Sequence, residues 1–138
     1  MATYISTNSS ARDNSPYLDL DLNFLAHPAT KDITKKKGVE AVKRAIRNLM
    51  LLKPGELGFN PSKGSGLHHL IFENISPATI TLLNAKIKET IEKYEPRAEL
   101  LETIINDDDR NGLNIDIIFR VINQTEPVKI SLFLERVR

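Results

Sequence analysis

The feature that most constrains the fold is a change of hydrophobic period at residues 94–97, which read Tyr-Glu-Pro-Arg. Ser76 and Pro77 suit the N-cap and the first turn of a helix that precedes this stretch. Pro96 ends that helix, because proline lacks an N–H and pushes the residue before it toward extended backbone. Within the helix, apolar side chains recur every three or four residues; they are Ile80, Leu83, Ile87, Ile91 and Tyr94.

After this corner the apolar residues alternate with polar ones, which is the period of a β-strand. Strands are predicted over residues 100–105, 113–122 and 128–134. Asn111–Gly112 is a strong hairpin signal between the first two strands, and residues 123–127 form the next turn. The sequence therefore predicts a three-stranded antiparallel meander with helices on its apolar face.

The opposite face of the predicted sheet also carries apolar side chains, namely Ile118, Ile122 and Phe133. A three-stranded antiparallel sheet has two open edges, whose backbone N–H and C=O groups can pair with a strand of another chain. We therefore expect the sheet to accept a strand from a partner, with Ile118 and Phe133 in the binding surface.

The rest of the chain completes an α+β fold. Residues 1–16 are polar and predict a flexible N-terminal arm, whereas residues 17–138 are expected to form a single domain. A short strand is predicted within residues 18–25, and a helix is expected after Gly38 as far as about Leu52. A loop rich in glycine and proline then leads to a short helix at residues 67–73. The meander would thus pack against two to three helices.

The composition excludes several classes of protein. A net charge of +1 over 138 residues creates no field that would attract nucleic acid, and few aromatic side chains are available for base stacking. The absence of cysteine excludes disulfides and cysteine metal sites. No apolar run reaches the length of a membrane span, and the N-terminus lacks the pattern of a signal peptide. Synthesis in the cytoplasm fits this composition.

Three motifs resemble ligand sites but are incomplete. Residues 64–69 (Gly-Ser-Gly-Leu-His-His) lack the third glycine of a dinucleotide fingerprint. His69 and Glu73 have the spacing of helical metal ligands, but two ligands do not make a site. Residues 107–112 (Asp-Asp-Asp-Arg-Asn-Gly) begin like a calcium loop, yet the twelfth position is Ile118 instead of glutamate. No cofactor and no metal are predicted.

The charged residues of the corner, Glu95 and Arg97, admit two interpretations. In the first, both are solvated charges at the exit of a helix and contribute little. In the second, they form a charged pair that is held out to dock a partner. The residue pattern alone leaves both interpretations open.

Several short motifs occur in an order known from one protein family: Pro54–Gly55–Glu56, Phe59–Asn60–Pro61, residues 64–67, residues 70–74, Pro77 and residues 94–97. From about Leu18 to the C-terminus, the chain resembles the small baseplate wedge, or sheath-initiator, family of contractile-tailed bacteriophages. The type VI secretion baseplate shares this family. Leu57–Gly58 and Lys63 depart from it, at places where members often carry a basic residue and an aromatic residue.

The resemblance implies an α+β fold, a structural role in the baseplate wedge and no catalysis. It implies that Glu95, Pro96 and Arg97 dock on the helical core bundle of other baseplate wedge proteins. It also implies that the sheet exchanges strands with tail sheath subunits and templates the first sheath ring. The protein would belong to the virion, in the tail baseplate, after assembly in the host cytoplasm. It would occur there in multiple copies and be a monomer or weak oligomer alone.

Two other functions stay open. A type VI secretion baseplate subunit would use the same surfaces, and only the neighbouring genes would distinguish it. A cell-wall glycosidase, suggested by lysozyme labels on related proteins, would need two carboxylates across a cleft, for which Glu73 and Asp107 are candidates. For the baseplate role, we expect Arg97→Ala to leave folding intact and to weaken incorporation into the wedge.

Overall fold

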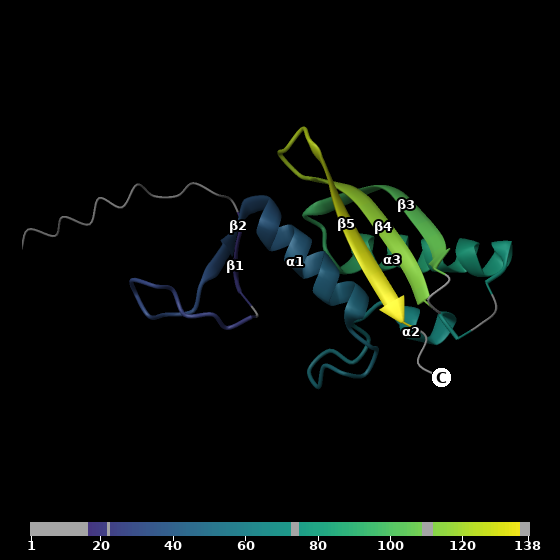
Figure 1. The fold of residues 1–138 in the computed structure, drawn as a ribbon, viewed down its shortest axis with the longest axis horizontal. Helices are drawn as coiled ribbons and strands as arrows, with labels where there is room; N and C mark the ends of the chain where they lie inside the picture. The colour runs from purple at the N-terminus through teal and green to yellow at the C-terminus, as the bar shows by residue number, and fades with distance from the viewer. Residues whose placement is uncertain (1–16, 22, 73–74, 109–111, 136–138) are drawn as a thin grey trace, which may run out of the picture. The chain divides into compact units, whose positions relative to one another are not determined.

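A computed structural model describes residues 17–21, 23–72, 75–108 and 112–135 (Figure 1). The elements follow the order β1 (Leu18–Leu20), β2 (Lys35–Lys37), α1 (Gly38–Leu51), α2 (Leu67–Leu70), α3 (Pro77–Tyr94), β3 (Ala98–Asp108), β4 (Gly112–Val121) and β5 (Pro127–Glu135). This content confirms the predicted α+β class. The backbone divides into two compact units, residues 1–41 and 42–138, which are described separately. The expected arm at residues 1–16 lies outside the described residues.

The N-terminal unit contains a two-stranded antiparallel ribbon of β1 and β2. The strand near residue 18 was predicted, but its partner was missed, because a run of three lysines is an unusual strand sequence. Asp21 explains how one of these lysines is accommodated. Its buried carboxylate lies 3.4 Å from the Lys36 ammonium and accepts the Asn23 N–H at 3.1 Å.

The second unit is built on the meander β3-β4-β5, whose strands are antiparallel neighbours in chain order, as predicted. The pairing of β4 with β5 is regular from Gly112–Glu135 to Arg120–Pro127. The pairing of β3 with β4 shifts register between Leu100 and Glu102. One side of the sheet, its inner face, is lined by apolar side chains; those fully or almost fully buried are Leu113, Ile115, Ile117, Phe119, Val121, Ile130, Leu132 and Leu134.

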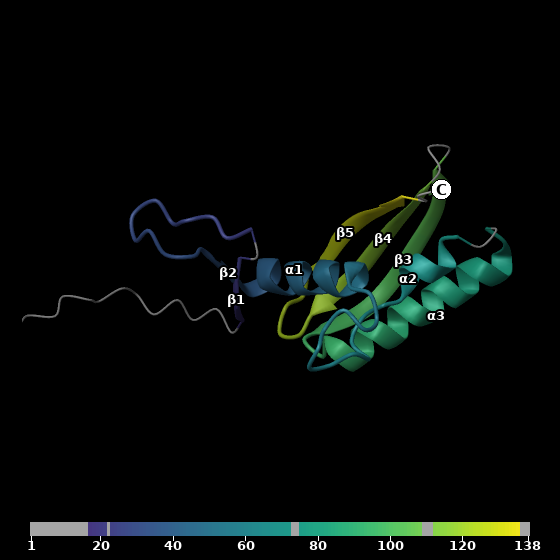
Figure 2. The same cartoon turned by 90° about the horizontal axis from the view of Figure 1, so that it is seen from below.

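The helices of this unit cover that inner face (Figure 2). Helix α3 packs along β3, and α2 packs against α3. In α3 the buried side chains include three of the predicted stripe, Leu83, Ile87 and Ile91. Ile46 and Met50 of α1, Leu67 of α2 and Ile71 directly after it complete the same core. Among the described elements, no helix covers the opposite, outer face of the sheet.

The predicted boundaries of α3 are confirmed. Ser76 is the N-cap, and its hydroxyl oxygen accepts the Thr79 N–H at 3.2 Å. Pro77 occupies the first helical position, where its missing N–H is not needed. The helix ends at Tyr94, directly before the Glu95–Pro96–Arg97 corner. The placement of the corner thus follows from local sequence signals at both ends of the helix.

Two neighbouring isoleucines test the assignment of the sheet faces. Ile117→Ala is expected to lower the free energy of unfolding by about 3 kcal/mol, because truncation of this fully buried side chain leaves a cavity. Ile118→Ala, on the outer face, is expected to cost less than about 1 kcal/mol. Urea unfolding followed by circular dichroism measures both changes. Equal losses at the two positions would contradict the observed register.

Candidate functional site

The backbone of the Glu95–Pro96–Arg97 corner is fixed by hydrogen bonds on both sides. The Glu95 N–H donates to the Ile91 carbonyl at 2.8 Å, which closes the last turn of α3. The Ala98 N–H donates to the Glu95 carbonyl at 3.1 Å, so that Pro96 occupies the second position of a tight turn, which proline favours. The Ile122 N–H donates to the Arg97 carbonyl at 2.9 Å and ties the corner to the end of β4.

The charged side chains of the corner bind each other. Arg97 Nε and Nη2 donate to the two carboxylate oxygens of Glu95, at 2.5 and 2.9 Å, in the bidentate arrangement that suits a guanidinium. Glu95 is only 5% exposed, whereas the Arg97 side chain is 27% exposed and Pro96 is exposed. The expectation that both charges project into solvent is wrong for Glu95. The docking role of these three residues stays a prediction.

The loop between α1 and α2, residues 52–66, is anchored to both helices. The Ser65 hydroxyl is buried, donates to the Met50 carbonyl at 2.6 Å and accepts the Leu67 N–H at 3.3 Å. Gly64 passes so close to the end of α1 that a Cβ would lie 2.8 Å from the Leu52 carbonyl oxygen. Its φ of +143° also favours glycine. Gly64 therefore turns the chain sharply where the loop meets the end of α1.

Two hydrogen bonds stabilise the outer part of this loop. The Gly55 N–H donates to the Pro61 carbonyl at 2.7 Å. The Tyr94 hydroxyl donates to the Ser62 carbonyl at 2.7 Å, which joins the loop to the last turn of α3 beside the corner. Phe59 lies fully exposed in the same loop. This exposure was not predicted, although a phenylalanine between Gly58 and an Asn-Pro pair is a detectable signal.

The outer face of the sheet carries two of the three predicted apolar residues, Ile118 and Phe133, among polar ones, whereas Ile122 is exposed directly after β4. Ile118 is half-buried, and Phe133 is exposed but lies over Gly112, where an added Cβ would overlap its ring. Asp116, between them, accepts hydrogen bonds from Lys129 at 2.8 Å and from Ser131 at 2.6 Å. These two donors hold the pKa of the Asp116 carboxyl below its ordinary value. The partner-binding role of Ile118 and Phe133 stays a prediction.

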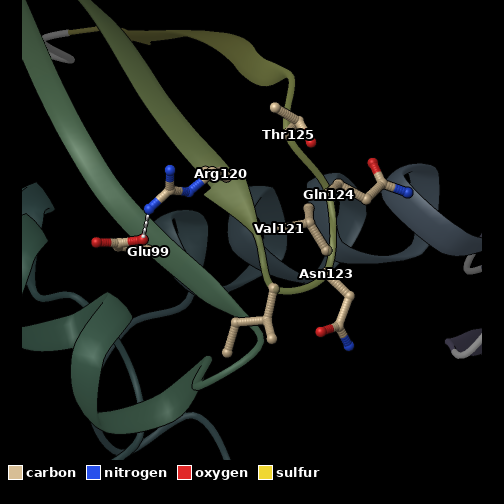
Figure 3. Close-up of a pocket in the computed structure, with 7 residues that line it drawn as sticks. Glu99, Arg120, Val121, Asn123, Gln124 and Thr125 are labelled. Carbon is tan, nitrogen blue, oxygen red and sulfur yellow. Dashed lines mark hydrogen bonds and ion pairs between the residues drawn. The ribbon is translucent and has the colours of Figure 1, made fainter.

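Two hollows on the described surface are open and lined by paired charges. Figure 3 shows one at the turn between β4 and β5, where Arg120 Nη2 donates to Glu99 Oε2 at 2.5 Å and Asn123 and Gln124 line the rim. A second runs between α3 and β3 and is lined by Glu92, Glu99 and Lys88. Both acids are ion-paired and largely exposed. Neither hollow places an acid in the apolar surroundings that raise the pKa of a glycosidase acid.

The structure gives no support to the metal-binding motifs of the sequence. Among the described residues, no group of three or more histidine, cysteine, aspartate or glutamate side chains could hold a metal ion. Asp107 is exposed near the end of β3, and His69 is exposed on α2. Glu73, Asp109 and Asn111 lie outside the described residues. No helix in the part of the chain that the structure describes is long and apolar enough to cross a membrane.

Comparison with known proteins identifies the family. Residues 36–126, more than half of the chain, match the model of the family described as baseplate wedge protein gp25. The chain belongs to this family. It is 26% identical over 123 residues to baseplate wedge protein gp25 of Enterobacteria phage T4, with 88% of each protein covered. The gp25 family is the one that the sequence motifs resembled, so that resemblance is confirmed.

Solved structures of similar proteins agree with this family. A chain of the baseplate of the anti-feeding prophage has a TM-score of 0.71 and 32% identity, with 78% of this chain and 87% of that chain covered. A putative tail lysozyme from Geobacter sulfurreducens has a TM-score of 0.65 and 26% identity, covering 70% and 89%. A chain of the postcontracted pyocin R2 baseplate shares the fold, with a TM-score of 0.54, 15% identity and coverage of 85% and 98%.

The ion pair of the corner changes the expectation for Arg97. Arg97→Ala is now expected to lower the free energy of unfolding by about 2 kcal/mol, because it leaves the buried Glu95 carboxylate without its partner. Arg97→Lys keeps the positive charge but loses the planar guanidinium that binds both carboxylate oxygens, and it should lower the free energy of unfolding by less than half as much. Chemical denaturation of both variants measures the difference. A wild-type stability for Arg97→Ala would show that the ion pair does not hold the corner.

Gly64 provides a test of the loop anchor. Gly64→Ala is expected to cost about 2 kcal/mol, because the new Cβ strains the backbone and meets the Leu52 carbonyl. Gly58→Ala in the same loop meets no atom within 4 Å and should change stability by less than about 0.5 kcal/mol. Thermal unfolding of the two variants distinguishes them. Similar melting temperatures would rule out the close approach at Gly64.

Proposed function

We propose that this chain is a structural subunit of a contractile-tail baseplate, in which it binds neighbouring wedge proteins through its corner and a tail sheath strand through β5. Membership of the baseplate wedge gp25 family is the observation that carries the proposal. The 32% identity to a chain of an assembled prophage baseplate supports it. In this proposal the protein resides in the virion, at the tail baseplate, after assembly in the host cytoplasm.

The two edges of the meander differ in how well they suit strand addition. The β3 edge carries a register shift between Leu100 and Glu102. Bulges are one device by which proteins protect an edge. Strand β5 (Pro127–Glu135) pairs with β4 without interruption, so its other side presents a regular ladder. We therefore assign the sheath contact to β5, where backbone pairing supplies affinity without demanding particular side chains.

The corner suits a contact with the helical core bundle of the wedge. Glu95 holds the Arg97 guanidinium in one orientation while about a quarter of the Arg97 side chain stays exposed. A pre-oriented side chain loses less freedom on binding than a flexible one. Pro96 adds an exposed apolar surface on a backbone that is fixed on both sides. Multiple copies in the ring would make individually weak contacts additive.

The same surfaces would serve a type VI secretion baseplate, which is the alternative assembly. The genes beside the coding sequence distinguish the two systems. In either assembly we propose that the chain has no catalytic activity, although one of the similar solved structures is that of a putative tail lysozyme.

Site-directed crosslinking tests the assignment of β5. The chain has no cysteine, so Ser131→Cys on β5 and Glu102→Cys on β3 can each carry a single benzophenone label. Both positions are exposed. In tails assembled from the gene cluster that encodes this chain, we expect illumination to link the β5 label to a sheath subunit. The β3 label is the matched control, and a sheath crosslink from β3 alone would overturn the assignment.

The non-enzymatic role has a direct test. The purified protein is expected to leave the turbidity of a peptidoglycan suspension unchanged, because the acids of the two hollows described above, Glu92 and Glu99, are ion-paired and largely exposed. A lysozyme of known activity serves as the positive control. Clearing that is abolished by Glu73→Gln or Asp107→Asn would replace the structural role by a glycosidase.

A further inference from the structure

We propose that residues 53–64, which we call the anchor loop, form a preorganised binding element whose Phe59 inserts into an apolar, acid-rimmed pocket of a neighbouring baseplate protein. This inference rests on the proposed function, since it requires that the chain be built into an assembly. It assigns a contact to a surface other than the corner and the sheet.

The exposure of Phe59 is the first observation. Its accessible surface is 109% of the reference value, so that the fold buries none of the ring. Phe72 is 64% exposed, and Phe133 covers Gly112. A phenylalanine that contacts nothing gives the folded chain no stability and exposes a large apolar surface to water. Burial of this ring by a partner would remove that unfavourable exposure.

The rigidity of the anchor loop is the second observation. The Gly55–Pro61 hydrogen bond closes its base, and the Lys53 N–H donates to the Glu56 carboxylate at 2.9 Å. A third hydrogen bond spans Phe59, because the Asn60 N–H donates to the Leu57 carbonyl at 3.2 Å. None of these bonds involves the Phe59 side chain. The loop therefore holds the ring outward in advance, which lowers the entropic cost of binding.

The charges of the anchor loop indicate the rim of the pocket. Lys53 and Lys63 flank the exposed ring in sequence, and neither has an ion-pair partner among the described residues. Glu56 is the acidic residue of the anchor loop, and its carboxylate accepts a hydrogen bond from the Lys53 N–H. The anchor loop thus carries an exposed aromatic ring and one more basic than acidic side chain. A pocket with apolar walls and acidic side chains at its mouth complements it.

The position of the anchor loop relates it to the corner. The hydrogen bond from the Tyr94 hydroxyl to the Ser62 carbonyl holds the loop against the last turn of α3, one residue before Glu95. One protein that binds the corner is therefore within reach of the loop. Phe59 would add a hydrophobic anchor of the kind that dominates interface energetics, beside a polar contact made by Arg97.

Incorporation into tails tests the anchor. Phe59→Ser, supplied to a tail gene cluster that lacks this chain, is expected to reduce its amount in purified tails at least about tenfold relative to wild type. Phe72→Ser is the matched control, because it removes an exposed phenylalanine outside the anchor loop. Unchanged melting of the isolated Phe59→Ser protein would exclude a folding defect. Equal incorporation of both variants would overturn the inference, whereas absence of the wild-type chain from tails would overturn the proposed function.

Photocrosslinking identifies the occupant of the surface. With p-benzoylphenylalanine at position 59, illumination of assembled tails should link this chain to one other baseplate protein, at a peptide rich in apolar and acidic residues. The same amino acid at position 72 should give at least about tenfold less of that product. A crosslink only to a second copy of this chain would overturn the assignment. Binding of the isolated protein to phosphatidylglycerol vesicles that depends on Phe59 would overturn it in favour of a membrane.

Discussion

The ion pair between Glu95 and Arg97 is the interaction on which the arrangement of the second unit depends. It lies where α3 ends and β3 begins, and with the backbone hydrogen bonds of the corner it holds the turn by which the chain enters the sheet. A carboxylate that is almost fully buried requires a partner, and the guanidinium two residues later satisfies both of its oxygens. The same pair that closes the corner therefore orients the cation that the surface offers.

The rest of the unit separates stability from binding. The core lies between the helices and the inner face of the sheet, and it is filled by ordinary apolar side chains. The surfaces assigned to partners make little use of that core: the corner is held by an ion pair, β5 offers backbone groups, and Phe59 stands on a hydrogen-bonded loop. Changes at these surfaces can therefore alter assembly without removing the hydrophobic interactions that hold the fold.

Sequence patterns were sufficient for the elements with local signals. Ser76, Pro77 and Pro96 marked both ends of α3, and alternation located the three long strands. Features that depend on distant contacts were not predictable. Lys36 of the strand Lys35–Lys37 lies beside the buried Asp21, and Glu95 is buried although it follows a helix end; both depend on tertiary packing. Phe59 differs from these, because its place between Gly58 and an Asn-Pro pair marks it as a loop residue, but only the structure shows how far its ring is exposed.

The edge of β3 is interrupted and the edge of β5 is regular, so the two edges of the meander differ in their ability to pair with another strand. A sheet that accepts further strands at β5 but not at β3 can be extended from one edge only. Each strand added to β5 would itself expose a fresh ladder, so growth could continue outward while the opposite flank stays inert. Under the proposed strand addition, such one-way extension would let a single small protein determine in which direction a much larger array is built.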